Sequence, residues 1–253
     1  MSSNVEVRSF WEQEPCGTSP DIVGDAAFHS REWFEEVERY RYDVEPFIHS
    51  LAQFTRHHGK TILEVGVGAG TDHLQWARAG CRCYGVDLTA ASIEATRDRL
   101  ALYGFQSELC CLDAEALPFD DHQFDVVYSW GVIHHTARPD RLIHEIHRVL
   151  KPRGLFIGMM YGRHSMTALR IWAHHALLKC RPWRSVSEII ATHVESAGTK
   201  AYTVAELQRL FAAFNTFTAK PVLAVSDRAG WPRWVSRFFP DDWGWFVMLT
   251  GHK

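Results

Sequence analysis

The sequence predicts an α/β fold in which a mostly parallel sheet of roughly seven strands is covered by helices on both faces. From residue 61 onward, short apolar runs alternate with helix-like stretches, and this alternation is typical of a parallel sheet. The 253 residues are 46% hydrophobic and 23% charged, which indicates a soluble globular chain with one sizeable core.

Each expected strand is a short apolar run between turn signals. The strands are expected at residues 61–68, 81–88, 107–114, 124–133, 154–161, 218–225 and 244–251. The helices between them are expected at residues 71–79, 90–103 and 138–150. A capping box, Thr203 to Glu206, starts a further helix before the last two strands.

Two segments lie outside this alternation. Before the sheet we expect one long helix from Ser30 to Val44, broken at Pro46 and continued to about His57. After the fifth strand, residues 162–200 form an insertion. Its helix, residues 165–179, is expected to place six residues on one face: Met166, Leu169, Trp172, Ala173, Ala176 and Leu177. The predicted organisation is a lid with helices (1–58), a core (59–161), the insertion as a substrate cap (162–200) and a C-terminal part that completes the core (201–253).

Composition and charge exclude several classes of protein. The formal net charge of −3 gives no field that would hold a nucleic acid. The first twenty residues contain no apolar run and no stretch of 18 apolar residues occurs, so we expect a cytoplasmic chain without integral membrane association. The six cysteines show no C-x-x-C spacing, which argues against a disulfide framework or a zinc site. The sequence does not predict an oligomeric state.

The most informative segment is a glycine-rich turn between the first strand and its helix. Gly66, Gly68 and Gly70 allow a tight turn and a close approach of the backbone to a ligand. Asp87 follows 21 residues after Gly66, at the tip of the next strand, where an acid can accept hydrogen bonds from a ribose. Alone, the first feature is often only a turn and the second only a helix cap. Together they indicate a nucleoside site.

Two kinds of nucleoside cofactor are compatible with this turn. A nicotinamide dinucleotide pattern would need a small residue where Thr71 stands. Glu64 would face a pyrophosphate unfavourably but suits an amino group. Asp113, followed by Ala114 at the end of the third strand, could meet an adenine amino group. These differences favour S-adenosylmethionine.

Four ordered motifs carry a resemblance to a known family: LEVGVGAGTD, YGVDLT, DAEALPFDDHQFDVVYSWGVIHH and EIHRVLKPRGLFI. Over about residues 60–160 the chain resembles class I S-adenosylmethionine-dependent methyltransferases of the small-molecule, ubiquinone-biosynthesis-like branch. The resemblance implies a Rossmann-like sheet of order 3-2-1-4-5-7-6 with an antiparallel seventh strand, and S-adenosylhomocysteine as the product. It also implies that Glu64, Gly66, Gly68 and Gly70 line the methionine part, Asp87 the ribose, Leu88 the adenine face, and Asp113 with Ala114 the adenine edge.

Methyl transfer mainly needs alignment of the acceptor and exclusion of water, because a sulfonium is already an activated electrophile. His134 and His135 end the fourth strand at the carboxyl edge, where either could act as a base or simply pack. Tyr161 ends the fifth strand and could position an acceptor or be ordinary core. His164, just after it, is a further candidate for contact with the substrate.

The acceptor site is expected to be built by the parts outside the resemblance. Trp11 belongs to the proposed lid, although a packed tail is the alternative. Arg41 could meet the methionine carboxylate or pair with Glu45. Arg170 and Trp172 lie on the insertion helix. The segment 162–187 has no acidic residue but contains Arg163, Arg170, Lys179, Arg181 and Arg184. It could select an anionic or amphiphilic substrate or rest on a membrane, with a solvated surface as the default. We expect Trp231, Trp234, Trp243 and Trp245 to be core.

The leading hypothesis is in-line methyl transfer to an O, N, S or C atom of a small molecule. The alternatives are a cofactor-binding or scaffold protein without turnover, and a methyltransferase acting on protein or nucleic acid. Ser129-Trp130-Gly131-Val132 stands where such relatives carry Asn-Pro-Pro-aromatic, which disfavours the last. No metal is expected, because the adjacent histidines lack the i, i+4 spacing of a helical metal site.

Overall fold

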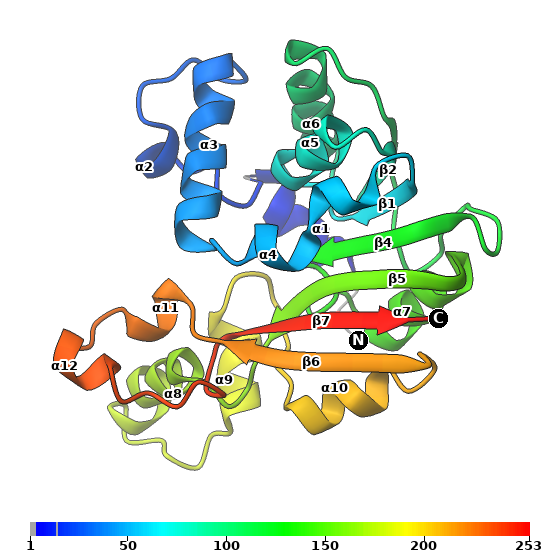
Figure 1. Cartoon of the computed structure of the whole chain (residues 1–253). Helices are drawn as coiled ribbons and strands as arrows, with labels where there is room; N and C mark the ends of the chain where they lie inside the picture. Colours follow the sequence, from blue (N-terminus) through cyan, green and yellow to red (C-terminus); the bar gives the residue numbers. More distant parts are fainter. Residues whose placement is uncertain (1–3, 14) are drawn as a thin grey trace.

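A single seven-stranded sheet organises the molecule in the computed structural model, which describes residues 4–13 and 15–253 (Figure 1). Its order is β3-β2-β1-β4-β5-β7-β6, which confirms the predicted topology. Residues 1–3 and Glu14 of the expected lid lie outside the described residues. The strands are β1 (Thr61–Val65), β2 (Arg82–Asp87), β3 (Glu108–Cys111), β4 (Phe124–Trp130), β5 (Leu150–Tyr161), β6 (Thr216–Val222) and β7 (Phe246–His252). Neighbours from β3 to β5 pair in parallel, and β7 is antiparallel to both β5 and β6.

Alternate residues of the central strands bury opposite faces of the sheet. Ile62 and Tyr128 belong to a cluster that includes apolar side chains of α4, η1 and α5. Leu63 and Val127 belong to a second cluster, with side chains of α7 and α10. These helices are α4 (Ile48–Ala52), η1 (Phe54–His57), α5 (Thr71–Arg78), α7 (Pro139–Val149) and α10 (Val204–Leu210). Two buried layers explain why the strands are apolar on both sides.

The N-terminal segment is helical with several breaks. The order is α1 (Asn4–Gln13), α2 (Pro20–Val23) and α3 (Arg31–Val44), and α6 (Ala90–Leu102) packs against α1 and α3. Ser30 caps α3, and the expected break near Pro46 separates α3 from α4. Gln53 in a left-handed conformation (φ 47°) then separates α4 from η1, so the predicted continuation to His57 is two short helices. The capping box of Thr203 and Glu206 is present at α10.

The insertion departs from the predicted helix. It contains α8 (Met166–Trp172), a π-helical turn η2 (Ala173–Leu177) and a second helix α9 (Val186–His193). Met166 and Ala176 are buried as predicted, but Leu169 and Leu177 are exposed. Thr167 and Ala168, outside the predicted face, are buried, so the predicted apolar face is wrong at those two leucines. Hydrogen bonds from residue i to i−5, such as Leu178 N–H to the Ala173 carbonyl, change the periodicity within the segment.

The connection between β6 and β7 holds two short helices, α11 (Val225–Arg228) and α12 (Arg233–Ser236). Trp245 is buried, but Trp231, Trp234 and Trp243 are exposed. The prediction that all four tryptophans are core is therefore wrong for three of them. In the described part of the chain, no helix combines the length and apolar character needed to cross a bilayer.

Candidate active site

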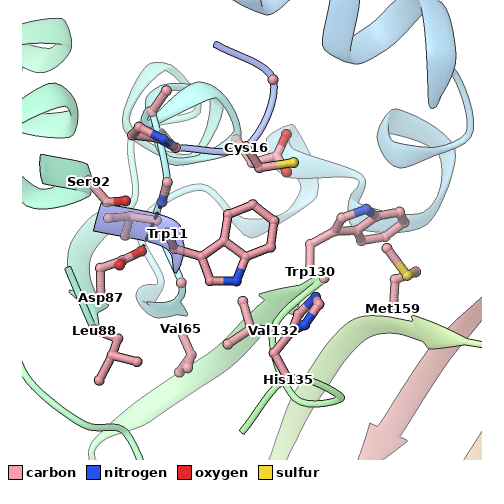
Figure 2. Close-up of a pocket in the computed structure, with 18 of the residues that line it drawn as sticks. Trp11, Cys16, Val65, Asp87, Leu88, Ser92, Trp130, Val132, His135 and Met159 are labelled. Atoms are coloured by element: carbon pink, nitrogen blue, oxygen red, sulfur yellow. Dashed lines mark hydrogen bonds between the residues drawn. The ribbon is translucent and has the colours of Figure 1, made fainter. Parts of the chain in front are cut away.

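One cavity of about 550 Å³ lies at the carboxyl edge of the sheet. The ends of β1, β2, β4 and β5 contribute Val65, Asp87, Trp130 and Tyr161 to its wall. Helices α1 and α3 and the segment after α9 complete it. Figure 2 shows Trp11 in the middle, with Asp87 and Ser92 on one side and Trp130, Met159 and His135 on the other. Ligands of open α/β sheets bind at this edge.

The glycine turn shapes one end of the cavity. Gly66 and Gly68 have positive φ angles of 83° and 53° and line the wall. A Cβ on Gly66 would lie 2.1 Å from Val132 Cγ2, whereas a Cβ on Gly68 would meet nothing within 4 Å. Gly70 (φ 73°) does not line the cavity, because it packs against Thr96 of α6. Gly70 therefore serves the packing of two helices and Gly66 the close packing of Val132, while Gly68 leaves room for a ligand.

Asp87 joins the turn to the start of α6. Its carboxylate accepts hydrogen bonds from the Gly68 N–H (3.1 Å) and from the Thr89 N–H and hydroxyl (2.9 and 2.8 Å). Thr89 in turn caps α6, so the helix-cap alternative is part of its role. Asp87 and Leu88 also line the cavity. Burial raises the pKa of Asp87 above its ordinary value, which indicates a carboxylate that a hydroxyl donor would stabilise.

Helix α1 is fastened over this end of the cavity at two points. Asn4 donates to both Asp113 and Glu115 at 2.8 Å and accepts from the Ala137 N–H at 2.7 Å. At the other end of α1, the Glu12 carboxylate accepts from the first N–H groups of α6, a favourable place for a negative charge. Asp113 and Ala114 line the cavity, as does Trp11 of α1.

Arg41 lies in the wall between two carboxylates. It contacts Asp72 at 2.6 Å and Glu45 at 3.2 Å, so the predicted pairing with Glu45 is confirmed. Tyr42 and Tyr128 also donate to Asp72. Although burial alone would lower it, Asp72 and Glu45 hold the pKa of Arg41 well above its ordinary value. The guanidinium is therefore charged and largely neutralised by its neighbours.

Glu64 lies at the floor of the cavity and is buried. Its carboxyl group contacts His73 Nδ1 at 3.0 Å. Burial and the neighbouring Asp72 raise the pKa of Glu64 well above its usual range, and burial lowers the pKa of His73 to about 4. A buried carboxyl group of this kind would be stabilised in its charged form by an ammonium group.

His135, Tyr161 and Glu195 meet at the other end of the cavity. His135 Nε2 lies 3.1 Å from the Glu195 carboxylate, and Nδ1 lies 2.9 and 3.0 Å from the hydroxyls of Ser196 and Thr199. The Tyr161 hydroxyl donates to the same carboxylate at 2.9 Å. The edge of Trp11 contacts the His135 ring. Glu195 was missed in the sequence, because it lies in the insertion, in no helix or strand, with a left-handed backbone (φ 50°).

His134 differs from His135 in its environment. It is fully buried, packs against Tyr161 with ring centroids 3.8 Å apart and the rings tilted by 38°, and does not line the cavity. Neither ring nitrogen has a hydrogen-bond partner within the described residues. Burial, His135 and Lys200 lower the pKa of His134 well below its ordinary value. This placement corrects the expectation that both histidines face the acceptor.

Three residues expected to contact the substrate also lie away from the cavity wall. His164 is exposed, and Arg170 donates to the Ala229 carbonyl. Trp172 donates through Nε1 to the Arg184 carbonyl at 2.8 Å. The insertion reaches the cavity through Glu195, after α9, rather than through α8.

Three potential metal ligands come together beside the cavity. Donor atoms of His134, His135 and Glu195 lie within 4.8 Å of one another. The prediction that no metal is bound rests on the spacing of histidines along a helix. Glu195 lies 60 residues after His135 in the chain, so that spacing gives no information about it. Metal independence stays a prediction.

Comparison with known proteins decides the class of the core. Residues 63–158 match a family described as a methyltransferase domain. This segment is a methyltransferase domain. The fatty-acid O-methyltransferase of Mycolicibacterium smegmatis is 34% identical over 125 residues, 49% of this chain and 44% of that protein. Phosphoethanolamine N-methyltransferase 2 of Caenorhabditis elegans is 32% identical over 107 residues, 42% and 24% of the two chains. The chain spans less than half the length of these relatives.

A solved structure supports the same fold over most of the chain. The PH0226 protein of Pyrococcus horikoshii aligns with a TM-score of 0.59 and 18% identity, covering 92% of this chain and 95% of that one. The glycines and Asp87 that face the cavity of this methyltransferase domain fit a nucleoside cofactor, because Gly68 leaves open space and Asp87 presents a buried acceptor there. The family match over residues 63–158 confirms the methyltransferase resemblance drawn from residues 60–160, while the roles that it implies for single residues stay predictions.

Proposed function

We propose that the chain transfers a methyl group from S-adenosylmethionine to a small molecule held beside His135, Tyr161 and Glu195. The observation that carries this proposal is the single cavity that joins the glycine turn and Asp87 to those three side chains. The relatives named above act on a fatty acid and on phosphoethanolamine, which supports a small-molecule acceptor.

We assign each part of the cofactor to residues at one end of the cavity. Asp87 would accept from the ribose hydroxyls, and Asp113 with Ala114 would border the adenine. Gly66 and Gly68 would let the methionine part approach the backbone, while Glu64 would face its ammonium group and Arg41 its carboxylate. When bound, the cofactor supplies a methyl group on a positively charged sulfur. The residues of the chain then have to align the acceptor and exclude water.

His135 and Glu195 are the groups that we propose for proton removal from the acceptor. His135 Nε2 faces Glu195, and the hydroxyls of Ser196 and Thr199 fix the ring through Nδ1. A base within hydrogen-bond reach assists attack by an oxygen or nitrogen acceptor. Tyr161 would hold Glu195 in place through its hydroxyl. Trp130, Met159 and Phe246 supply apolar wall around this end, which restricts water.

The charges of the wall favour an acceptor whose reacting group is uncharged or cationic. Acidic lining residues are Glu45, Glu64, Asp72, Asp87, Asp113, Glu115 and Glu195. Among the described lining residues Arg41 is the only lysine or arginine, and it is already paired with two of these acids. Arg170, which prompted the expectation of an anionic substrate, lies elsewhere. An anionic reacting group would meet like charge here.

The decisive experiment incubates the protein with methyl-labelled S-adenosylmethionine and a fractionated metabolite extract. We expect label in a small molecule with wild type and with Glu94→Gln, a change at an exposed residue of α6 that does not line the cavity. Glu195→Gln should lower the rate of labelling by at least about 100-fold, a typical contribution of a positioned base. Binding of the cofactor without any labelled product would support the scaffold alternative. Label confined to protein or nucleic acid would contradict the small-molecule proposal.

A further inference from the structure

Large apolar side chains are exposed mainly on one part of the molecule. Of the fourteen exposed large hydrophobic residues in the described ranges, nine lie between residues 169 and 243. We call this set the apolar corner: Leu169, Leu177, Leu178, Trp183, Val225, Trp231, Trp234, Phe238 and Trp243. Four of its members are tryptophans, and Trp183 and Trp234 are 77% and 70% exposed. Soluble proteins rarely gather such residues on the surface without a partner.

The apolar corner is one place in space, although it comes from two segments. Figure 1 shows α8, α9, α11 and α12 together at one end of the molecule. Arg170 of α8 donates to the Ala229 carbonyl after α11, and the Met166 N–H donates to the Trp243 carbonyl at 3.2 Å. Trp172 ties the loop that carries Trp183 to α8 through the Arg184 carbonyl. The exposed rings therefore stand on a hydrogen-bonded support.

Unpaired cations lie among these apolar side chains. Lys179, Arg181, Arg228 and Arg237 are exposed, and none has an ion-pair partner among the described residues. Glu188 is held by Arg184. Asp241 and Asp242 are the acidic residues exposed between α12 and β7. The apolar corner thus carries an excess of positive charge on a chain whose formal net charge is −3.

We propose that the apolar corner docks onto the surface of an anionic lipid bilayer. Tryptophan rings are favoured at the level of the lipid headgroups, and exposed lysine and arginine side chains are attracted by anionic lipids. A second copy of the chain fits less well, because a twofold interface would place the four unpaired cations against the same four cations.

The docking surface is continuous with the wall of the cavity. Val225 of α11 is 56% exposed, belongs to the apolar corner and also lines the cavity. Docking would therefore place one rim of the cavity beside the bilayer. If the proposed methyl transfer holds, this position suits an acceptor with a lipid-like body that enters from the membrane. The docking itself does not depend on that transfer.

The test measures co-sedimentation of the full chain with phosphatidylcholine vesicles, with and without phosphatidylglycerol. We expect binding to the anionic vesicles only, weakened by salt. Trp183→Ser combined with Trp234→Ser should abolish binding. The matched control is Phe28→Ser, since Phe28 is 78% exposed and lies between α2 and α3. Lys179→Ser and Arg181→Ser should each weaken binding by about fivefold at low salt, while Arg97→Ser on α6 should not.

The possible outcomes separate the bilayer from other occupants. Thermal unfolding of each variant checks that the fold is intact, which keeps a loss of binding interpretable. Equal binding to zwitterionic vesicles, no binding to either, or equal loss with Phe28→Ser would overturn the proposal. A dimer in light scattering that the tryptophan double variant dissociates would assign the surface to a second copy instead. Methyl transfer to a water-soluble acceptor is scored separately, so its failure is distinguishable from a failure of docking.

Discussion

Asp87 is the residue on which both the shape and the chemistry of the cofactor end depend. It holds the Gly68 N–H and the Thr89 cap while its carboxylate faces the cavity. We expect Asp87→Ala to weaken the binding of S-adenosylmethionine and of S-adenosylhomocysteine by about 1.5–3 kcal/mol, the range for hydrogen bonds to a charged group. Calorimetric titration measures both affinities. Asp87→Asn keeps one acceptor oxygen, so its affinity for both ligands should lie between those of wild type and Asp87→Ala. Unchanged affinity, or tight binding of NAD, would contradict the assignment.

Glu195 offers a test of the acceptor end that leaves the cofactor end intact. Glu195→Gln removes the charge that faces His135 Nε2 while preserving the size of the side chain. Turnover should fall, while the affinity for S-adenosylhomocysteine should change by less than about twofold, because the partners of Glu195 among the described residues are His135 and Tyr161 and not the glycine turn or Asp87. His135→Ala and Tyr161→Phe should likewise lower turnover and leave the affinity for S-adenosylhomocysteine nearly unchanged. Wild-type kinetics in all three variants would refute this placement of the acceptor.

His134 should make the stability of the fold depend on pH. Burial keeps its ring neutral in the native state, whereas an unfolded histidine titrates near pH 6.5. As pH falls below that value the unfolded chain binds an additional proton, so the free energy of unfolding decreases. We compare the free energies of unfolding of His134→Phe and wild type, measured in urea. The value for the variant minus the value for wild type should increase by about 1 kcal/mol from pH 6.5 to pH 5.5. Parallel pH curves for the two proteins would show that His134 titrates normally in the fold.

The cluster of His134, His135 and Glu195 calls for a separate measurement with metals. We expect full activity after treatment with a chelator, because His135 and Glu195 already bond each other and His134 is enclosed by aromatic rings. Activity is assayed before chelation, after it, and after addition of divalent ions. A loss that zinc or manganese restores would assign a metal to this cluster.

At the scale of elements, we propose that α1 closes the cofactor end. Asn4→Ala removes its contacts to Asp113, Glu115 and the Ala137 N–H. We expect the affinity for S-adenosylhomocysteine to fall by about 1 kcal/mol and trypsin to cut faster after Arg8, within α1. Ser9→Ala is the control, since Ser9 is exposed on the same helix. Equal affinity and equal cleavage in the two variants would show that α1 is a fixed part of the wall.

The sequence predicted elements well where one period of apolar residues extended along the whole element. The strands with both faces buried and the capping box of α10 are examples, because each signal is local. The prediction for the insertion helix was wrong at Leu177 for a local reason too, because the π-helical turn that begins at Ala173 interrupts the α-helical period. Leu169 precedes that turn, and α8 buries Thr167 and Ala168 in its place. The prediction of burial was wrong for the exposed tryptophans, because it relied on the general tendency of apolar residues to be buried. That tendency gives no information about a surface that contacts a partner.

The candidate site was predictable in proportion to how close its residues lie in the chain. The glycine turn and Asp87 form a pattern of fixed spacing, so the sequence alone was enough to propose them as a cofactor site, and the structure brings them to one cavity. Glu195 joins His135 only through tertiary packing, and no spacing in the sequence marks it. The same holds for Asn4, whose partners lie more than 100 residues away.

At the scale of the whole molecule, the order of the strands places the two ends of the cavity on different parts of the chain. β1 and β2 carry the glycine turn and Asp87, while β4 and β5 lead to His135 and Tyr161. The segment after α9 and the connection between β6 and β7 then border the acceptor end. Changes in these two connections can alter the acceptor without disturbing the cofactor end, which is how one fold accommodates several chemistries.

The two attachments of α1 have a kinetic consequence. If α1 covers the bound cofactor, as we propose, exchange of spent for fresh cofactor requires the Asn4 contacts at one end of α1 and the Glu12 contacts to the start of α6 to break. Opening of a lid is often slower than chemistry. In such a case the first turnover is fast and later ones wait for product release, so the steady-state rate measures the motion of α1 and not the transfer step.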